Sequence, residues 1–300
     1  MINAKIAIII LNWNQEKDTS ECLDSLGKVD YHNNDVILVD NGSRDDSPDK
    51  LGKRFPKVKM IRNTKNLGFA EGNNIAIREA LKTDSQYIML LNNDTMVEPD
   101  FISRLVETAE KDQSIGIVSP KIMFYGERNK IWFIGGRYYP LIKKPFHQFY
   151  GQEDRGQIKQ PQAVDWVSGC CMLVKREVFE KIGLLDKDYF NNYEDVDFCV
   201  RARKAGYKIV IVPQVRIYHK FAAAMGGKFS PMYTYYRTRN NLLYFRKTGQ
   251  IIPLAFNFVI FPIYSIIMSL VRMDLKSLKA TFAGIKDFLE GHYGKGSANV

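Results

Sequence analysis

The sequence predicts an α/β protein with a doubly wound sheet, because short apolar runs alternate with segments of helical character. Helices are expected over residues 69–81 and 99–111, the second of them entered through Glu98-Pro99. The apolar runs between the helices have the length and composition of strands that are buried on both faces of a parallel sheet. These predicted strands cover residues 5–11, 36–39, 58–61, 87–91 and 115–118.

The pattern changes in the second half of the chain. Residues 125–163 are rich in Gly, Pro, Tyr and charged side chains, and we expect them to form a long irregular insertion of the kind that often carries function. Regular elements are then expected again, with a strand over 164–174, helices over 176–182 and 194–205, and a strand over 207–212.

The composition is that of an ordinary globular protein. Of the 300 residues, 45% are hydrophobic and 25% are charged, which excludes a disordered chain, a collagen and a disulfide scaffold. None of the four cysteines has CxxC spacing, so buried free thiols in a reducing compartment are expected. The first residues lack a basic segment and a cleavage site, and we therefore expect no export signal.

The charge is concentrated near the end of the chain. Residues 201–300 hold 16 of the 43 Lys and Arg residues but 3 of the 33 Asp and Glu residues. Such a basic segment indicates an anionic partner, either nucleic acid or anionic lipid. Nucleic acid is the weaker interpretation, because the positive charge lies beside an apolar stretch and not on a sheet studded with aromatic residues.

That apolar stretch is residues 251–271, which are uncharged and long enough to cross a bilayer. Pro253, Asn257 and Pro262 interrupt it, and basic residues flank both of its ends. With both flanks basic, a single span has no clear orientation. We expect the segment to lie along, or dip into, the cytoplasmic face of the membrane, with a buried core helix or a subunit interface as the alternatives.

Polar clusters follow three of the predicted strands. They are Asn12-Trp13-Asn14, Asp40-Asn41-Gly42-Ser43 and Asn92-Asn93-Asp94-Thr95. Turn chemistry could explain any one of them. In open α/β sheets, however, ligands bind at the carboxyl ends of the strands, so three such clusters together favour a binding site.

The residue types in these clusters suit a nucleotide diphosphate. Trp13 can stack on a base, and Asp40 can accept hydrogen bonds from a base or a ribose. Asp94 supplies a hard oxygen ligand for Mg²⁺ or Mn²⁺ bridging a diphosphate. The chain has no GxGxxG motif, and residues 66–70 lack the spacing of a Walker loop, which argues against a dehydrogenase and a P-loop NTPase.

A second group of acids opens the predicted helix 194–205. Glu194, Asp195 and Asp197 suit the positive end of a helix dipole, and Asp197 can pair with Arg201 one turn later. A carboxylate at a helix start that faces a cleft can also remove a proton from an acceptor hydroxyl. His219 ends an apolar run, and taken alone it is more often a structural histidine than a ligand.

In order and spacing, these motifs resemble the GT-A fold glycosyltransferases of family 2, especially the rhamnosyltransferase-like branch of bacterial surface-polysaccharide enzymes. The resemblance covers roughly residues 4–240. It rests on residues 10–14, 39–43, 66–74, 91–95, 169–171, 194–197 and 235–240 together with His219.

The resemblance implies roles for single residues. Asp195 corresponds to the catalytic base, and Asp94 with His219 to the metal site, although Asn92 replaces the first acid of the family's DxD motif. The residues implied on the donor side are Leu11, Asn12, Trp13, Asp40, Asn41, Gly42, Asn66, Gly68, Asn74, Asn93 and Asp94. Those implied on the acceptor side are Trp166, Gly169 and Glu194.

The expected protein is therefore an inverting glycosyltransferase that uses Mg²⁺ or Mn²⁺ and a dTDP-rhamnose or UDP-hexose donor. Its acceptor would be a glycan or a polyprenyl-diphosphate-linked sugar, and its location the inner face of the cell membrane. The expected GT-A catalytic domain covers 1–225, divided near residue 120 into donor and acceptor halves, and a helical, apolar extension over 226–300 associates with the membrane. A nucleotide-sugar-binding protein without catalysis is the alternative.

Overall fold

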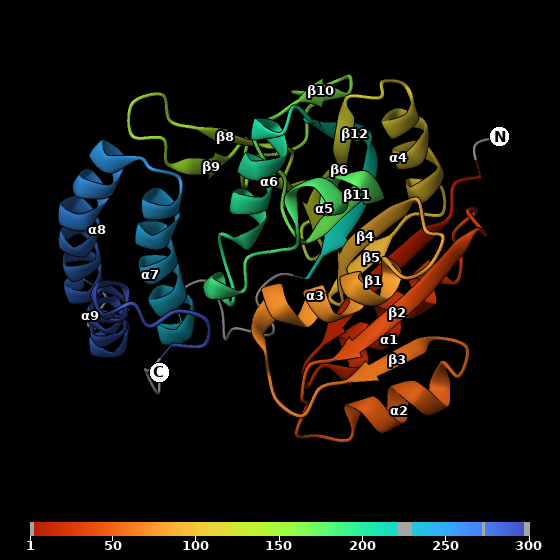
Figure 1. Cartoon of the computed structure of the whole chain (residues 1–300), viewed down its shortest axis with the longest axis horizontal. Helices are drawn as coiled ribbons and strands as arrows, with labels where there is room; N and C mark the ends of the chain where they lie inside the picture. Colours follow the sequence, from red (N-terminus) through yellow and green to blue (C-terminus); the bar gives the residue numbers. More distant parts are fainter. Residues whose placement is uncertain (1–2, 221–229, 272–273, 297–300) are drawn as a thin grey trace.

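The computed structural model describes residues 3–220, 230–271 and 274–296. Its centre is a mixed ten-stranded sheet with helices on both faces, as the strand and helix pattern predicts (Figure 1). The strand order along the main path is β10-β12-β6-β11-β4-β1-β2-β3. The strands of this path are β1 (Ile6–Asn12), β2 (Asn34–Asp40), β3 (Lys59–Arg62), β4 (Tyr87–Asn92), β6 (Ile115–Phe124), β10 (Gln162–Ala163), β11 (Cys171–Lys175) and β12 (Lys208–His219).

The N-terminal half of the sheet is parallel, and its register brings the polar strand ends together. β1 pairs with β2 so that Asn12 lies beside Asp40, and with β4 so that Leu11 lies beside Asn92. All residues of β1 except Leu11 are buried, as expected for a strand inside a parallel sheet that is covered on both faces. The expected convergence of three polar clusters at one edge of the sheet is confirmed.

The C-terminal half of the sheet contains antiparallel pairs. β11 runs antiparallel to both β4 and β6, and β5 (Thr95–Val97) runs antiparallel to the end of β12. β7 (Ile131–Phe133) pairs antiparallel with β6, while β8 (Gly136–Tyr138) and β9 (Pro145–His147) form a separate hairpin. This mixed arrangement agrees with the expected GT-A architecture.

Two expectations were wrong in detail. The strand expected over 164–174 begins at Cys171, because residues 164–170 form a buried loop in which the Gly169 amide binds a side chain instead of a neighbouring strand. An apolar run signals burial, and burial alone does not make a strand. The insertion 125–163 is also more regular than expected, since it contains β7, β8, β9 and β10.

The helices agree with the expected alternation. Before the extension they are α1 (Glu16–Leu26), α2 (Ser47–Arg54), α3 (Gly68–Ala80), α4 (Phe101–Glu110), α5 (Arg176–Ile182) and α6 (Glu194–Lys204), with a short 3-10 turn at Lys187–Tyr189. The extension adds α7 (Pro231–Lys247), α8 (Ile251–Val271) and α9 (Leu275–Glu290). Figure 1 shows these last three helices packed together at one end of the molecule, far from β3 and α2.

α8 is not a buried core helix, which was one alternative for residues 251–271. It is long and apolar enough to cross a membrane by length and composition, and only 18% of its most hydrophobic window is buried. One side packs against α7 and α9, where Asn257 and Ser265 are buried. The other side exposes large apolar side chains such as Ile252 and Ile263.

Gly42 provides a test of how tightly the strand-end loops are packed. It has a φ of +73°, and an added Cβ would lie 2.4 Å from the carbonyl carbon of Lys65. We expect Gly42→Ala to destabilise the fold through both backbone strain and overpacking, each about 1–3 kcal/mol. Gly151, with a φ of +76° and open space around it, is the matched control, and Gly151→Ala should show only the backbone cost. Equal losses in urea denaturation would contradict the proposed close packing at Gly42.

Candidate active site

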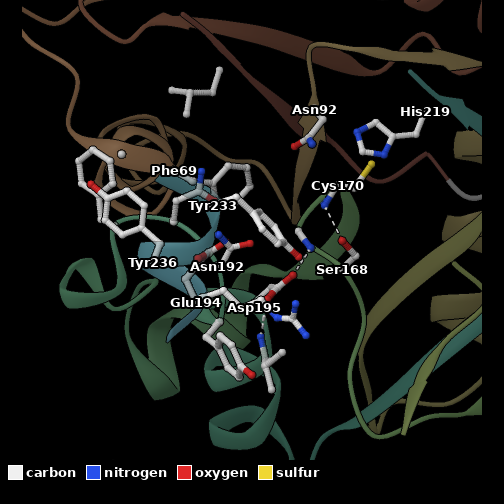
Figure 2. Close-up of a pocket in the computed structure, with 18 of the residues that line it drawn as sticks. Phe69, Asn92, Ser168, Cys170, Asn192, Glu194, Asp195, His219, Tyr233 and Tyr236 are labelled. Carbon is white, nitrogen blue, oxygen red and sulfur yellow. Dashed lines mark hydrogen bonds between the residues drawn. The ribbon is translucent and has the colours of Figure 1, made fainter. Parts of the chain in front are cut away.

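A pocket of about 600 Å³ opens at the sheet edge where the strand-end clusters meet. Figure 2 shows side chains from the sheet, from α6 and from α7 directed into it. The structure brings most of the predicted site residues together in its wall. Those are Leu11, Trp13, Asn41, Asn66, Gly68, Asn93, Asp94, Trp166, Gly169, Glu194, Asp195 and His219.

Four predicted donor-side residues do not line the pocket. Asn12 is fully buried and donates hydrogen bonds to Asp40 (3.2 Å) and Ser47 (3.1 Å), so the pair braces the ends of β1 and β2. Gly42 allows the close approach of the loop at Lys65. Asn74 exchanges two hydrogen bonds with the backbone of a distant loop. Sequence position alone does not distinguish such bracing residues from ligand-contacting ones.

Asn41 combines both roles. Its side chain donates to the Asn66 side chain and to the Gly68 carbonyl, each at 3.1 Å, and it accepts a hydrogen bond from the Leu67 amide. These bonds hold residues 66–68 against the end of β2, where they form one wall of the pocket. A polar side chain at this position therefore shapes the loop that faces a ligand.

Asp94 and His219 form a pair at one end of the pocket. Antiparallel pairing of β5 with β12 sets Thr95 opposite His219, and this register places the His219 Nε2 atom 3.0 Å from Asp94 Oδ1. Both side chains are buried. Burial opposes ionisation of Asp94, but His219, backbone hydrogen bonding and Lys220 outweigh it and keep the pKa of Asp94 below its usual value.

The Asp94–His219 pair fits a divalent metal by the chemistry of its donors. A carboxylate oxygen and an imidazole nitrogen are both ligands for Mn²⁺, and the carboxylate suits Mg²⁺. Asn93 has a different role, because its amide donates to Gln15 (3.1 Å) and Thr19 (2.8 Å) on and beside α1. The edge of the Trp132 ring packs against His219 with ring centroids 4.5 Å apart, which fixes the imidazole plane.

Asp195 lies in the first turn of α6 and is aimed by backbone amides. Its Oδ2 atom accepts a hydrogen bond from the Gly169 amide (2.9 Å), and Oδ1 accepts one from the Val196 amide (2.8 Å). Burial raises the pKa of Asp195 in spite of these hydrogen bonds. Burial, and then the charge of Asp195, raise the pKa of Glu194 well above normal.

The backbone just before α6 is strained. Phe190, Asn192 and Tyr193 have φ values of 60°, 69° and 77°, and none of them is a glycine. Left-handed conformations of such residues cost about 1–3 kcal/mol each and persist where the surroundings impose them, often at functional sites. The strain therefore marks the turn that delivers Glu194 and Asp195 to the pocket.

α7 imposes that strained conformation. The Asn240 side chain donates hydrogen bonds to the carbonyl groups of Tyr189 (2.7 Å), Asn191 (2.7 Å) and Asn192 (2.9 Å). Arg239 beside it is fully buried and donates to the Tyr189 carbonyl. α7 follows the boundary expected at residue 225 and was expected to belong to the membrane-associated extension. Its hydrogen bonds nevertheless support the turn that leads to Glu194 and Asp195.

The pocket also contains residues that were not predicted as site residues. Most are aromatic or basic and come from the 125–163 insertion or from α7. They are Trp132, Tyr139, Lys144, Phe146, His147, Tyr150, Tyr233, Tyr236 and Arg237, with Phe190 and Asn192 from the strained turn. The only signal available in the sequence was the density of aromatic residues in these two segments, which does not indicate the direction of any side chain.

Residues 7–183 match the sequence model of one protein family, glycosyl transferase family 2. The chain belongs to this family. The expected family and the expected class of enzyme, a glycosyltransferase, are confirmed, and the GT-A fold is confirmed by solved structures. The mannosyltransferase PcManGT from Pyrobaculum calidifontis, solved with GDP-Man and Mn²⁺, has a TM-score of 0.60 over 99% of this chain and 77% of that protein, at 16% identity.

Curated relatives include rhamnosyltransferases, in agreement with the branch that the motifs resemble. The dTDP-rhamnosyl transferase RfbF of Shigella flexneri is 27% identical over 314 residues, which cover the whole of both chains. The N-acetylglucosaminyl-diphospho-decaprenol L-rhamnosyltransferase of Mycobacterium tuberculosis is 29% identical over 64% of this chain and 68% of that protein.

Proposed function

We propose that this glycosyltransferase moves a sugar, with inversion, from a nucleoside-diphosphate donor to a polyprenyl-diphosphate-linked or glycan acceptor during synthesis of a cell-surface polysaccharide. One observation carries the proposal. The same pocket contains Asp195, which can serve as a base, and, separate from it, the Asp94–His219 pair, whose side chains can bind a divalent cation. The similarity to RfbF along the full chain supports dTDP-rhamnose as the donor, with a UDP-hexose as the other candidate.

Asp195 would act as the only general base. Its carboxylate takes the proton of the acceptor hydroxyl while that oxygen bonds to the anomeric carbon, and the bond from this carbon to the donor diphosphate breaks. Glycosidases need a second carboxyl group to protonate a poor leaving group, whereas a nucleoside diphosphate leaves as a stabilised anion.

Asp94 and His219 would hold the divalent cation next to the donor diphosphate. The bound cation supplies positive charge that neutralises the charge developing on the departing diphosphate. The protein positions the two metal-binding side chains, because the pairing of β5 with β12 sets Asp94 beside His219 and the Trp132 ring packs against the imidazole. Since Asn92 replaces an acid of the usual motif, Asp94 carries the carboxylate part of this site.

Asp195→Asn tests the proposed base. The substitution keeps the shape of the side chain but removes its capacity to accept a proton, so transfer should fall by at least about 100-fold. Nucleoside-diphosphate binding, measured by calorimetry with Mn²⁺, should be nearly unchanged. A variant that retains substantial transfer would exclude Asp195 as the base.

Asp197→Asn is the matched control in the same helical turn. Asp197 is outside the pocket and pairs with Arg201 at 2.8 Å, so this variant should lose stability and keep transfer per folded molecule.

The pH dependence of the wild-type transfer rate provides a second check on the base. Because burial raises the pKa of Asp195, the rate should fall on acidification at a pH above the ordinary range for aspartate.

Asp94→Asn tests the metal site. Replacing the carboxylate by an amide should weaken Mn²⁺-dependent donor binding by at least about tenfold, or ~1.4 kcal/mol. Removal of divalent cations with EDTA should weaken binding to the wild type in the same way, and it should have little further effect on the variant. Equal donor affinity of both proteins with and without Mn²⁺ would contradict the role of Asp94.

We further propose that α8 and α9 dock the enzyme on an anionic membrane surface. On α9, Leu275, Lys279, Phe282, Lys286 and Leu289 follow one another at intervals of four and three residues, so they share one face of the helix, and all are exposed. Alternating apolar and basic side chains on an exposed face are typical of helices that lie in a lipid interface.

The exposed side of α8 supports the same orientation. Ile252, Val259, Ile263, Ile267 and Leu270 are each about half exposed or more, and their spacing places them along one side of the helix. A helix packed on its other side against α7 and α9 suits immersion in the interface better than passage through it. This arrangement would hold the pocket close to a lipid-linked acceptor.

The double variant Lys279→Gln, Lys286→Gln tests this surface. Each lysine near an anionic membrane contributes about 1 kcal/mol, so binding to phosphatidylglycerol-containing vesicles should fall by about 10- to 30-fold in sedimentation assays. Lys50→Gln on α2, at the far end of the molecule in Figure 1, should have no effect. Unchanged binding of the double variant, or a stable dimer in solution that covers α8, would contradict the proposal.

A further inference from the structure

The pocket has two basic side chains that the proposed reaction does not use. Lys144 comes from the residues just before β9, and Arg237 comes from α7. Both are half-buried. Among the residues that the structure describes, no other Lys or Arg lines this pocket. Both side chains line the same pocket. Burial lowers the pKa of Lys144, and the charge of Arg237 lowers it further.

Arg237 lies on the Asp195 side of the pocket, one helical turn before Asn241, whose side chain donates to the Tyr193 hydroxyl at 2.6 Å. Tyr193 directly precedes Glu194 and Asp195 at the start of α6. At the other end, His219 and Lys220 lower the pKa of Asp94. In Figure 2, Tyr236 of α7 and His219 lie on opposite sides of the view, with Asp195 between them.

Aromatic side chains line the same pocket as the two cations. Tyr139 and Phe146, on either side of the hairpin that carries Lys144, are in ring contact at 4.5 Å, and the Phe190 ring stacks on Tyr236 at 5.0 Å. The hairpin tip is exposed, and Leu141 has 90% of its surface accessible. An anion with an apolar tail would find charge inside the pocket and apolar surface at its mouth.

We propose that Lys144 and Arg237 form an anion subsite for the diphosphate of a lipid-linked acceptor, separate from the donor diphosphate at Asp94. An arginine fork and a lysine ammonium group are the side chains that proteins use to bind phosphate oxygens. Both side chains line the same pocket, and a diphosphate carries the opposite charge to each of them. The sugar attached to the diphosphate then extends toward Asp195.

This inference rests on the proposed function for the class of acceptor, but its test does not require transfer. The probe is geranyl diphosphate, a short prenyl diphosphate, titrated by calorimetry into the full-length protein with saturating UDP or dTDP and Mn²⁺, so that the donor site is filled. Arg237→Gln and Lys144→Gln should each weaken binding by at least about tenfold. Arg237→Lys, which keeps the charge, should weaken it less.

Lys143→Gln is the matched control, because Lys143 is exposed on the same hairpin and outside the pocket. It should bind the probe as the wild type does, and thermal unfolding should show all variants folded. The inference is overturned if the Lys144 and Arg237 variants bind the probe normally, or if they lose nucleotide affinity instead. If the wild type binds the probe but transfers no sugar to any acceptor, the proposed function fails while the subsite stands.

Discussion

The parallel register of β1 with its two neighbours is the constraint on which the site depends. Because Asn12 lies beside Asp40 and Leu11 beside Asn92, three strand ends finish at the same level of the sheet. A slip of one residue would turn every side chain of β1 to the opposite face and separate the polar ends. The bond from Asn12 to Asp40 closes this edge from within, and the loops that carry Asn66 and Asp94 are built on it.

The two halves of the pocket are joined by short backbone contacts as well as by the sheet. The amides of Phe69 and Ala70, at the start of α3, both donate to the carbonyl group of Phe190. Phe190 belongs to the strained turn before α6, and Asn240 of α7 holds that same turn. These contacts from both sides fix the turn and maintain its unfavourable φ values. A displacement of the start of α3 would therefore move the turn that precedes Asp195.

The sequence predicted the parallel part of the fold well because buried parallel strands are continuous apolar runs with polar ends. It predicted Asp94 and Asp195 from strand ends and a helix start, with the resemblance supplying their roles. It failed where tertiary context decides. Asn12 and Asn74 have the residue type of ligand contacts, yet their bonds go to the protein itself. Arg237 and Lys144 come from segments without regular periodicity, so no pattern in the sequence placed them together.

The dual contacts of α7 divide the extension into parts with different freedom to change during evolution. One side of α7 holds the strained turn before α6 through Asn240, and the other side packs against α8 and α9. Substitutions on the first side of α7 would therefore disturb the turn that precedes Glu194 and Asp195, whereas the outer faces of α8 and α9 are exposed. On the proposed membrane surface, an exchange of those outer side chains would change the lipid preference and leave the sugar specificity as it is.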